Sequence, residues 1–264
     1  MLELYTHPMS PCAQKVRIVL AEKQLPWKAY HVDLAQKENL KPEYLKLNPL
    51  GVVPTLLHDG KPVIESSIIC EYLDDAFPEH RLTVQDDYAR SQMRFWMKHV
   101  DVKLHPACGA LQWPLVMRSS MLEKSAEERQ KLLDKIPEKP RRERQKRLVE
   151  MGLEAPDVID AVSVYRKTIL LMEQALKKNS WIVAEQFTLA DLCLAPYFQT
   201  VQQFGWQQLF ADCPQVSDWF ERCRQRTSYQ KAVAEDFPEQ LLQELYAKGQ
   251  QAWPSIEKHL QKIS

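Results

Sequence analysis

The chain has 264 residues, and 35 Lys and Arg balance 35 Asp and Glu, so its formal net charge at pH 7 is zero. This length can bury a sizeable core in two domains, and the neutral balance gives no electrostatic case for binding nucleic acid or an anionic membrane. No apolar run approaches the roughly 20 residues of a spanning helix, and the N-terminus lacks a basic segment followed by an apolar one, so we expect a cytoplasmic protein without a membrane partner.

Residues 1–80 alternate strand and helix patterns, which predicts a small α/β domain. After the first strand-like run, Ser10 can cap a helix over 12–23 while Pro11 occupies the first helical position, where its missing N–H costs nothing. The Ser10 hydroxyl and the free N–H groups of the first turn would then point to one place. A thiolate located there would gain a hydrogen bond and a favourable helix dipole. The alternative is that Ser10 is only a cap.

Val53-Pro54 is the second signal, since the proline follows an Asn-Pro-Leu-Gly turn and begins a strand. A cis bond there would leave the N–H and C=O of Val53 facing outward, where they could pair with a bound peptide as an added strand. An ordinary trans proline at a strand start is the alternative. Asp59-Gly60 then predicts a tight hairpin turn between the next two strands.

Glu65-Ser66-Ser67 is the third signal, because it precedes an apolar helical run. The serines can cap this helix, and its free N–H groups would bind a carboxylate. Glu65 would then meet an ammonium group. As with Ser10, a cap without a ligand is the alternative.

A linker over 78–87 separates this domain from a helical domain over 88–264, where glycine is scarce. Thr188 and Asp191 form a near-capping-box at the start of one helix, a pattern that serves folding rather than chemistry. Apolar residues at three- and four-residue spacing predict helices over 88–108, 157–178, 188–204, 216–226 and 239–248.

The charged stretch over 118–154 lengthens the connection between two of these helices. Glutamates interleave its basic run and no aromatic residue accompanies it, which favours a solvated helical insert over a nucleic-acid arm. The insert could wall a pocket or occupy a dimer edge.

The cysteines show neither close pairing nor a neighbouring histidine cluster, so the sequence predicts neither a metal site nor a disulfide framework. Cys12 differs from the others because a thiol in the first turn of a helix can acquire a lowered pKa. The six cysteines are Cys12, Cys70, Cys108, Cys193, Cys213 and Cys223.

The chain resembles the glutathione transferases along its whole length. The resemblance rests on Ser-Pro-Cys-Ala-Gln-Lys-Val-Arg, Leu-Asn-Pro-Leu-Gly-Val-Val-Pro-Thr-Leu, Glu-Ser-Ser-Ile-Ile-Cys-Glu-Tyr-Leu and the later Thr-Leu-Ala-Asp. The segments beginning His58-Asp59-Gly60-Lys61 and Glu71-Tyr72-Leu73 are similar to bacterial β-aryl-etherase-type members and their fungal relatives. The resemblance implies a thioredoxin-like domain over 1–80, an all-helical domain over 88–264 and a homodimer.

It further implies glutathione as co-substrate, with no metal. Ser10 would be the catalytic residue, which ionises the glutathione sulfur for attack on an apolar, preferentially aromatic, electrophile, with conjugation, ether cleavage or dehalogenation as the outcome. Glutathione would be held by Val53, Pro54, Glu65 and Ser66, and its glycine end by Asn39 and Lys41. These assignments are carried over by position from the family.

The acceptor pocket is expected between the two domains, where an apolar cleft suits aromatic substrates. Its predicted residues, with His105 as a further polar candidate, are Cys12, Leu111, Trp113, Met117, Tyr197 and Trp206. Aromatic residues and methionine at helical spacing are also typical of plain core. Two other functions stay open: a glutathione-dependent thiol/disulfide oxidoreductase that uses Cys12, and a non-catalytic binder of glutathione or another ligand.

Overall fold

Alternating apolar residues build a four-stranded sheet in the computed structural model, which describes residues 1–235 and 237–263. Leu4 of the first strand lies opposite Leu56 of the third, and both are fully buried. The hairpin turns at Asp59 and Gly60 with positive φ at both residues, as the sequence predicts. In spatial order the strands are β2 (Trp27–His31), β1 (Leu2–Thr6), β3 (Thr55–His58) and β4 (Lys61–Val63), with only the β1–β2 pair parallel.

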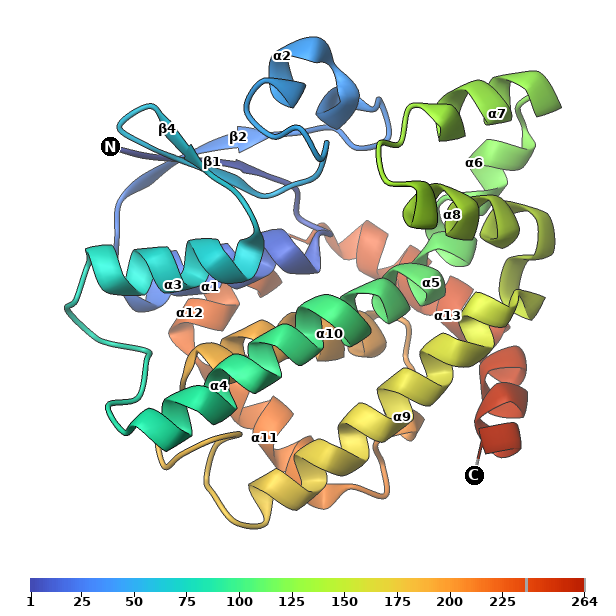
Figure 1. Cartoon of the computed structure of the whole chain (residues 1–264). Coiled ribbons are helices and arrows are strands. Elements are labelled where there is room, and N and C mark those ends of the chain that lie inside the picture. The colour runs from blue at the N-terminus through green and yellow to red at the C-terminus, as the bar shows by residue number, and fades with distance from the viewer. Residues whose placement is uncertain (236, 264) are drawn as a thin grey trace.

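Helices α1 (Pro11–Glu22) and α3 (Ser66–Ala76) pack together on one face of this sheet (Figure 1). The loop between β2 and β3 contains the short helices η1 (Glu38–Leu40) and α2 (Pro42–Leu45). Most of α1 is buried because helices of the second domain contact it opposite the sheet. Its buried cations are paired: Lys15 Nζ lies 2.8 Å from Asp101 Oδ1, and Arg17 Nε donates to the Ala232 carbonyl at 2.8 Å.

From residue 87 the described chain is mainly helical. The long helices of the bundle are α4 (Asp87–His99), α5 (His105–Val116), α9 (Pro156–Leu176), α10 (Leu189–Gln203), α11 (Pro214–Gln225) and α13 (Glu239–Ile263). The shorter segments are η2 (Val100–Leu104), η3 (Gly152–Glu154), η4 (Gln207–Leu209), α12 (Thr227–Tyr229) and η5 (Gln230–Ala234). Across the described ranges, no helix combines the length and apolar character needed to cross a membrane.

The predicted capping box at the start of α10 is present. Asp191 is fully buried, and its two carboxylate oxygens accept hydrogen bonds from Thr188 N and Oγ1, Ile182 N and Trp219 Nε1, each at 2.9 Å. The carboxylate therefore joins the start of α10 to the preceding loop and to α11.

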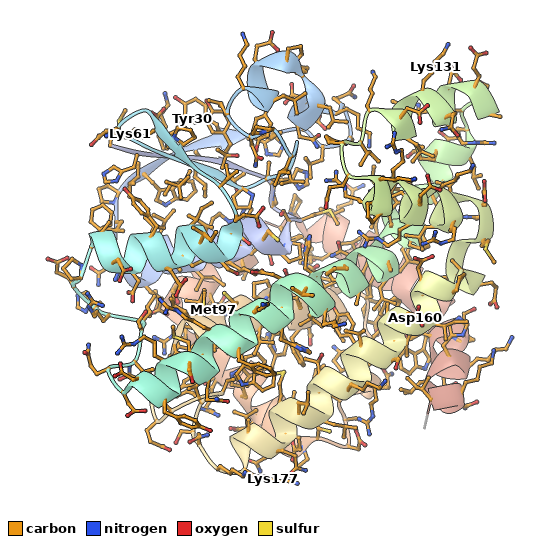
Figure 2. The ribbon with its side chains drawn as sticks, viewed as in Figure 1. Tyr30, Lys61, Met97, Lys131, Asp160 and Lys177 are labelled. Carbon is orange, nitrogen blue, oxygen red and sulfur yellow. The ribbon has the colours of Figure 1, made fainter. Side chains whose placement is uncertain are left out.

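The charged insert folds into a lobe made of α6 (Arg118–Leu122), α7 (Ala126–Asp134) and α8 (Lys139–Met151). The lobe lies beside the end of α5, and Lys131 marks its outer side (Figures 1 and 2). It has a small core of its own, formed by Met121, Leu133, Ile136 and Val149. Trp113 of α5 packs against both this core and the main one.

Candidate active site

Ser10 caps α1, as predicted: its Oγ accepts a hydrogen bond from Ala13 N at 3.3 Å, and Pro11 is the first helical residue. Because the hydroxyl only accepts in this contact, its hydrogen stays available to a ligand. Ser10 borders a cavity of about 530 Å³ between the α/β layer, α5 and the insert. This volume suits a small organic ligand.

The loop before β3 presents main-chain groups to the same cavity. The Val53–Pro54 bond is cis, and neither the N–H nor the C=O of Val53 hydrogen-bonds to any residue that the structure describes. Asn39 Nδ2 donates to the Gly51 carbonyl at 2.7 Å, whereas its buried Oδ1 has no hydrogen-bond partner in the described ranges. Asn39, Val53 and Pro54 all line the cavity. Buried polar groups usually have partners, so these atoms are suited to meet a ligand.

The predicted serine cap of α3 is wrong. The helix begins at Ser66 itself, and its N-cap is Glu65, whose side chain makes no capping hydrogen bond. The hydroxyls of Ser66 and Ser67 instead accept from Lys15 Nζ, at 3.3 and 3.4 Å, because this buried ammonium requires polar partners. Glu65 has a φ of +69°, a conformation that is rare outside glycine and clusters at functional sites. Glu65 and Ser66 both line the cavity.

Cys12 lies one helical position beyond Pro11 and also lines the cavity. Its Sγ is 3.4 Å from Nδ1 of His105 and 3.7 Å from the hydroxyl of Tyr197, which is fully buried behind it. Burial by itself would raise the pKa of the Cys12 thiol. The charges of His105 and Lys15 and hydrogen bonds from His105 and Ser66 outweigh burial and lower this pKa from 9.0 to about 6. Cys12 is therefore largely a thiolate at neutral pH.

Other predicted site residues lie away from the cavity wall. Lys41 is exposed, and its Nζ pairs with Glu38 at 2.9 Å. Trp206 is 1% exposed and donates from Nε1 to the Gly249 carbonyl, so it belongs to the core. Of the predicted acceptor residues only Cys12 lines the cavity, and those that do not are Leu111, Trp113, Met117, Tyr197 and Trp206. Apolar helical spacing predicts burial, and it does not tell whether a side chain faces a neighbouring helix or a pocket.

His105, the further polar candidate, lines the cavity from the first turn of α5. The sequence analysis missed the rest of the wall opposite the α/β layer, which includes Pro106 and Gly109 of α5 and Asp101 of η2. The remainder comes from the start of α8, namely Glu138, Pro140, Arg141, Arg144 and Gln145. The Pro-Arg-Arg sequence at the start of a predicted helix was the available signal, but only the packing of α8 against α5 places it at the site.

Two family models match this chain and identify the class of protein that this fold and site define. "Glutathione S-transferase, N-terminal domain" matches residues 9–76, and "Glutathione S-transferase, C-terminal domain" matches residues 155–227, together just over half of the chain. The chain belongs to the glutathione S-transferase family, which makes it an enzyme that works with glutathione. The predicted fold class, a thioredoxin-like domain followed by an all-helical domain, is confirmed.

Several known proteins are similar to this chain over most of their own length. Protein LigF of Sphingobium sp. is 28% identical over 249 residues, which cover 91% of this chain and 96% of LigF. The crystal structure of beta-etherase LigF from Sphingobium sp. strain SYK-6 superposes with a TM-score of 0.80 at 26% identity, covering 89% of this chain and 99% of that one. Glutathione S-transferase 3 of Glycine max is 27% identical over 80% of each chain.

Proposed function

We propose that this protein ionises the sulfur of glutathione and directs it at an apolar, preferentially aromatic, electrophile. The observation that carries the proposal is the convergence of Ser10, the unpaired main chain of Val53 and the N-terminus of α3 on one cavity. These are three separate segments of the α/β layer. Their common ligand would be a short peptide with a thiol, an ammonium group and carboxylates, which describes glutathione.

Each part of glutathione has a suitable partner in this cavity. The N–H and C=O of Val53 would pair with the peptide main chain, as in an added strand. The first N–H groups of α3 would bind the γ-glutamyl carboxylate, and Glu65 its ammonium group. Asn39 Oδ1 would accept from the N–H of the glycine residue. Since Lys41 pairs with Glu38, its contact with glutathione would require this exposed pair to open.

The reaction would follow from thiolate activation and proximity. Ser10 would donate its hydroxyl hydrogen to the glutathione sulfur, and the N-terminal dipole of α1 would favour the negative charge. The thiolate would then attack an electrophilic carbon and expel a leaving group, or add to the acceptor. The similarity to a beta-etherase supports ether cleavage as one outcome, beside conjugation and dehalogenation.

An ultraviolet titration with glutathione at neutral pH tests the proposal through the absorption band of the thiolate. Because Cys12 contributes a thiolate of its own, the titration is best done on Cys12→Ser. We expect glutathione to produce the band in this variant and Cys12→Ser/Ser10→Ala to lose it. With an aromatic chloride as acceptor, Ser10→Ala should lower kcat about a hundredfold or more, as loss of a hydrogen bond to a reacting group typically does. An unchanged band and rate in the Ser10 variant would overturn this role.

The environment of Cys12 favours one second candidate, a thiol/disulfide oxidoreductase. The Cys12 thiolate would attack the glutathionyl sulfur of a mixed disulfide and release the other thiol; a second glutathione would then attack Cys12–S–S–glutathione and leave as oxidised glutathione. Under this candidate Cys12→Ser abolishes turnover while Ser10→Ala retains it. The two single variants therefore separate the candidates.

We also infer that the protein forms a homodimer. Ile68 on α3, Phe95 on α4 and Val102 in η2 are large apolar side chains that are 57%, 57% and 56% exposed. Such a group is typical of a surface that another chain covers. Light scattering should give twice the chain mass, and Phe95→Glu should shift it toward the monomer; a monomer mass for the unaltered protein contradicts the inference.

The free state of all six cysteines supports a reducing compartment such as the cytoplasm.

A further inference from the structure

The start of α8 brings two arginines to the candidate active site without giving them partners. Arg141 and Arg144 are half-buried, line the cavity, and have no hydrogen-bond or ion-pair partner in residues 1–235 and 237–263. The other two arginines of α8 are paired: Arg142 Nη1 lies 3.7 Å from Asp134, and Arg147 binds both carboxylate oxygens of Asp157 at 2.7 Å. The unpaired arginines are therefore those that face the cavity.

Other positive charge lies close to this pair. Lys37, in the loop after β2, is close enough to Arg141 for the two charges to repel. Burial is the main cause that lowers the pKa of Lys37, and repulsion by Arg141 adds to it. Burial is also the main cause that lowers the pKa values of Arg141 and Arg144. Like charges that are partly shielded from water repel one another, and their burial adds to the energetic cost. A bound anion would offset both effects.

The cavity is thus charged in opposite senses at its two ends. Glu65 and Asp101 lie at the end formed by α3 and α1, where Asp101 pairs with Lys15. At the α8 end, Glu138 lines the wall beside the two arginines, and Lys37 adds a further positive charge near Arg141. Asp157 also attracts Arg144, but its carboxylate already pairs with Arg147. The net charge at this end is therefore positive. The planar guanidinium groups match the two oxygens of a carboxylate, which they bind with paired hydrogen bonds.

We propose that Arg141 and Arg144 bind a carboxylate on the acceptor, so that the preferred electrophile is an aromatic compound that carries a carboxylate away from the reacting carbon. This inference rests on the proposed function, since it assumes that glutathione occupies the side of the cavity lined by Ser10, Val53 and Glu65. The γ-glutamyl carboxylate would be held on that side by α3, and the glycine carboxylate by Lys41 once its pair with Glu38 opens. The α8 side is then left for the acceptor.

Binding of two glutathione conjugates by calorimetry tests the proposal without requiring turnover. The probes are S-(4-carboxy-2-nitrophenyl)glutathione and its methyl ester, which differ only in the acceptor carboxylate. The unaltered protein should bind the carboxylate about tenfold or more tightly than the ester, as expected for charge-assisted hydrogen bonds. Arg141→Ala/Arg144→Ala should lose this preference and keep its affinity for the ester. Arg142→Ala, which removes an arginine from the same helix but not from the cavity, should retain the preference.

The outcomes separate failure of this inference from failure of the proposed function. If the unaltered protein binds glutathione and both conjugates equally well, only the acceptor carboxylate is excluded. If the double variant weakens glutathione itself as much as the carboxylate conjugate, the arginines hold the glycine carboxylate of glutathione, and the inference is overturned. If neither glutathione nor either conjugate binds, the proposed function fails.

Discussion

At the scale of single residues, Cys12 owes its chemistry to its neighbours. His105 and Lys15 supply positive charge beside its sulfur, and this outweighs the effect of burial on the thiol pKa. Burial instead raises the pKa values of Cys70, Cys108 and Cys223, so these thiols stay protonated at neutral pH. Cys12 therefore differs in protonation from at least three other cysteines of the chain.

Alkylation of Cys12 by iodoacetamide should therefore rise with pH around a midpoint near 6. Removing a cation favours the protonated thiol, so His105→Ala should move the midpoint upward. Peptide mass spectrometry across pH 5–9 measures both midpoints, because iodoacetamide reacts with the thiolate rather than with the thiol. His99→Ala is the matched control, since its ring contacts Thr168 instead. A midpoint above 8 in the unaltered protein would contradict the account.

At the scale of elements, the start of α10 depends on Asp191. Asp191→Ala removes the acceptor from four buried donors, which belong to Thr188, Ile182 and Trp219. Each unsatisfied buried donor costs about 1–3 kcal/mol, so we expect the free energy of unfolding to fall by at least about 2 kcal/mol. Urea denaturation measures the loss. Asp160→Ala, an exposed substitution on α9 (Figure 2), should stay within about 0.5 kcal/mol. Normal stability with a selective loss of rate in Asp191→Ala would refute the structural role.

The contact between α13 and the end of α10 depends on Gly249. A Cβ at this position would lie 2.0 Å from the Phe204 carbonyl oxygen, a main-chain atom that cannot move aside cheaply. Gly249 is therefore a packing contact rather than a helix stop, and α13 continues past the predicted end at 248 to Ile263. Gly249→Ala should lower the free energy of unfolding by about 1–3 kcal/mol in thermal or chemical denaturation.

Gly109→Ala supplies the matched control, because a Cβ on this α5 glycine meets nothing within 4 Å. It should be neutral or stabilising by up to about 1 kcal/mol, through helix propensity. Equal destabilisation by the two substitutions would argue against the packing explanation.

At the scale of the whole molecule, the insert is a lobe whose core is nearly separate from the main one. Ile136→Ala should open the lobe locally, since it removes part of a four-residue core at a cost of about 2–5 kcal/mol. Hydrogen exchange should accelerate over 119–150 and stay unchanged in α9 and α10. The matched substitution in the main core, Ile256→Ala, should accelerate exchange in α9 and α10 as well. The lobe is not independent if Ile136→Ala accelerates exchange throughout.

Polar contacts hold the two domains together, and no local sequence pattern predicts them. Arg226 binds both carboxylate oxygens of Glu22 at 2.6 and 2.8 Å, and Ser228 donates to the same carboxylate. Together with the Lys15–Asp101 pair, these contacts fix the α/β layer against the helices. The walls of the candidate active-site cavity depend on that arrangement, because each domain supplies one side.

The sequence by itself determined the features that depend on neighbouring residues. Ser10 caps α1, Asp59-Gly60 turns the hairpin and Thr188 with Asp191 starts α10, because caps and turns are set within about four residues. The predicted Ser66-Ser67 cap is wrong because Lys15 of α1 donates hydrogen bonds to both hydroxyls. Only the tertiary structure joined Cys12 to Tyr197, 185 residues away, and brought Arg141 and Arg144 over the cavity. Such contacts arise from packing of distant segments, and apolar spacing is the same whether a helix faces the core or a pocket.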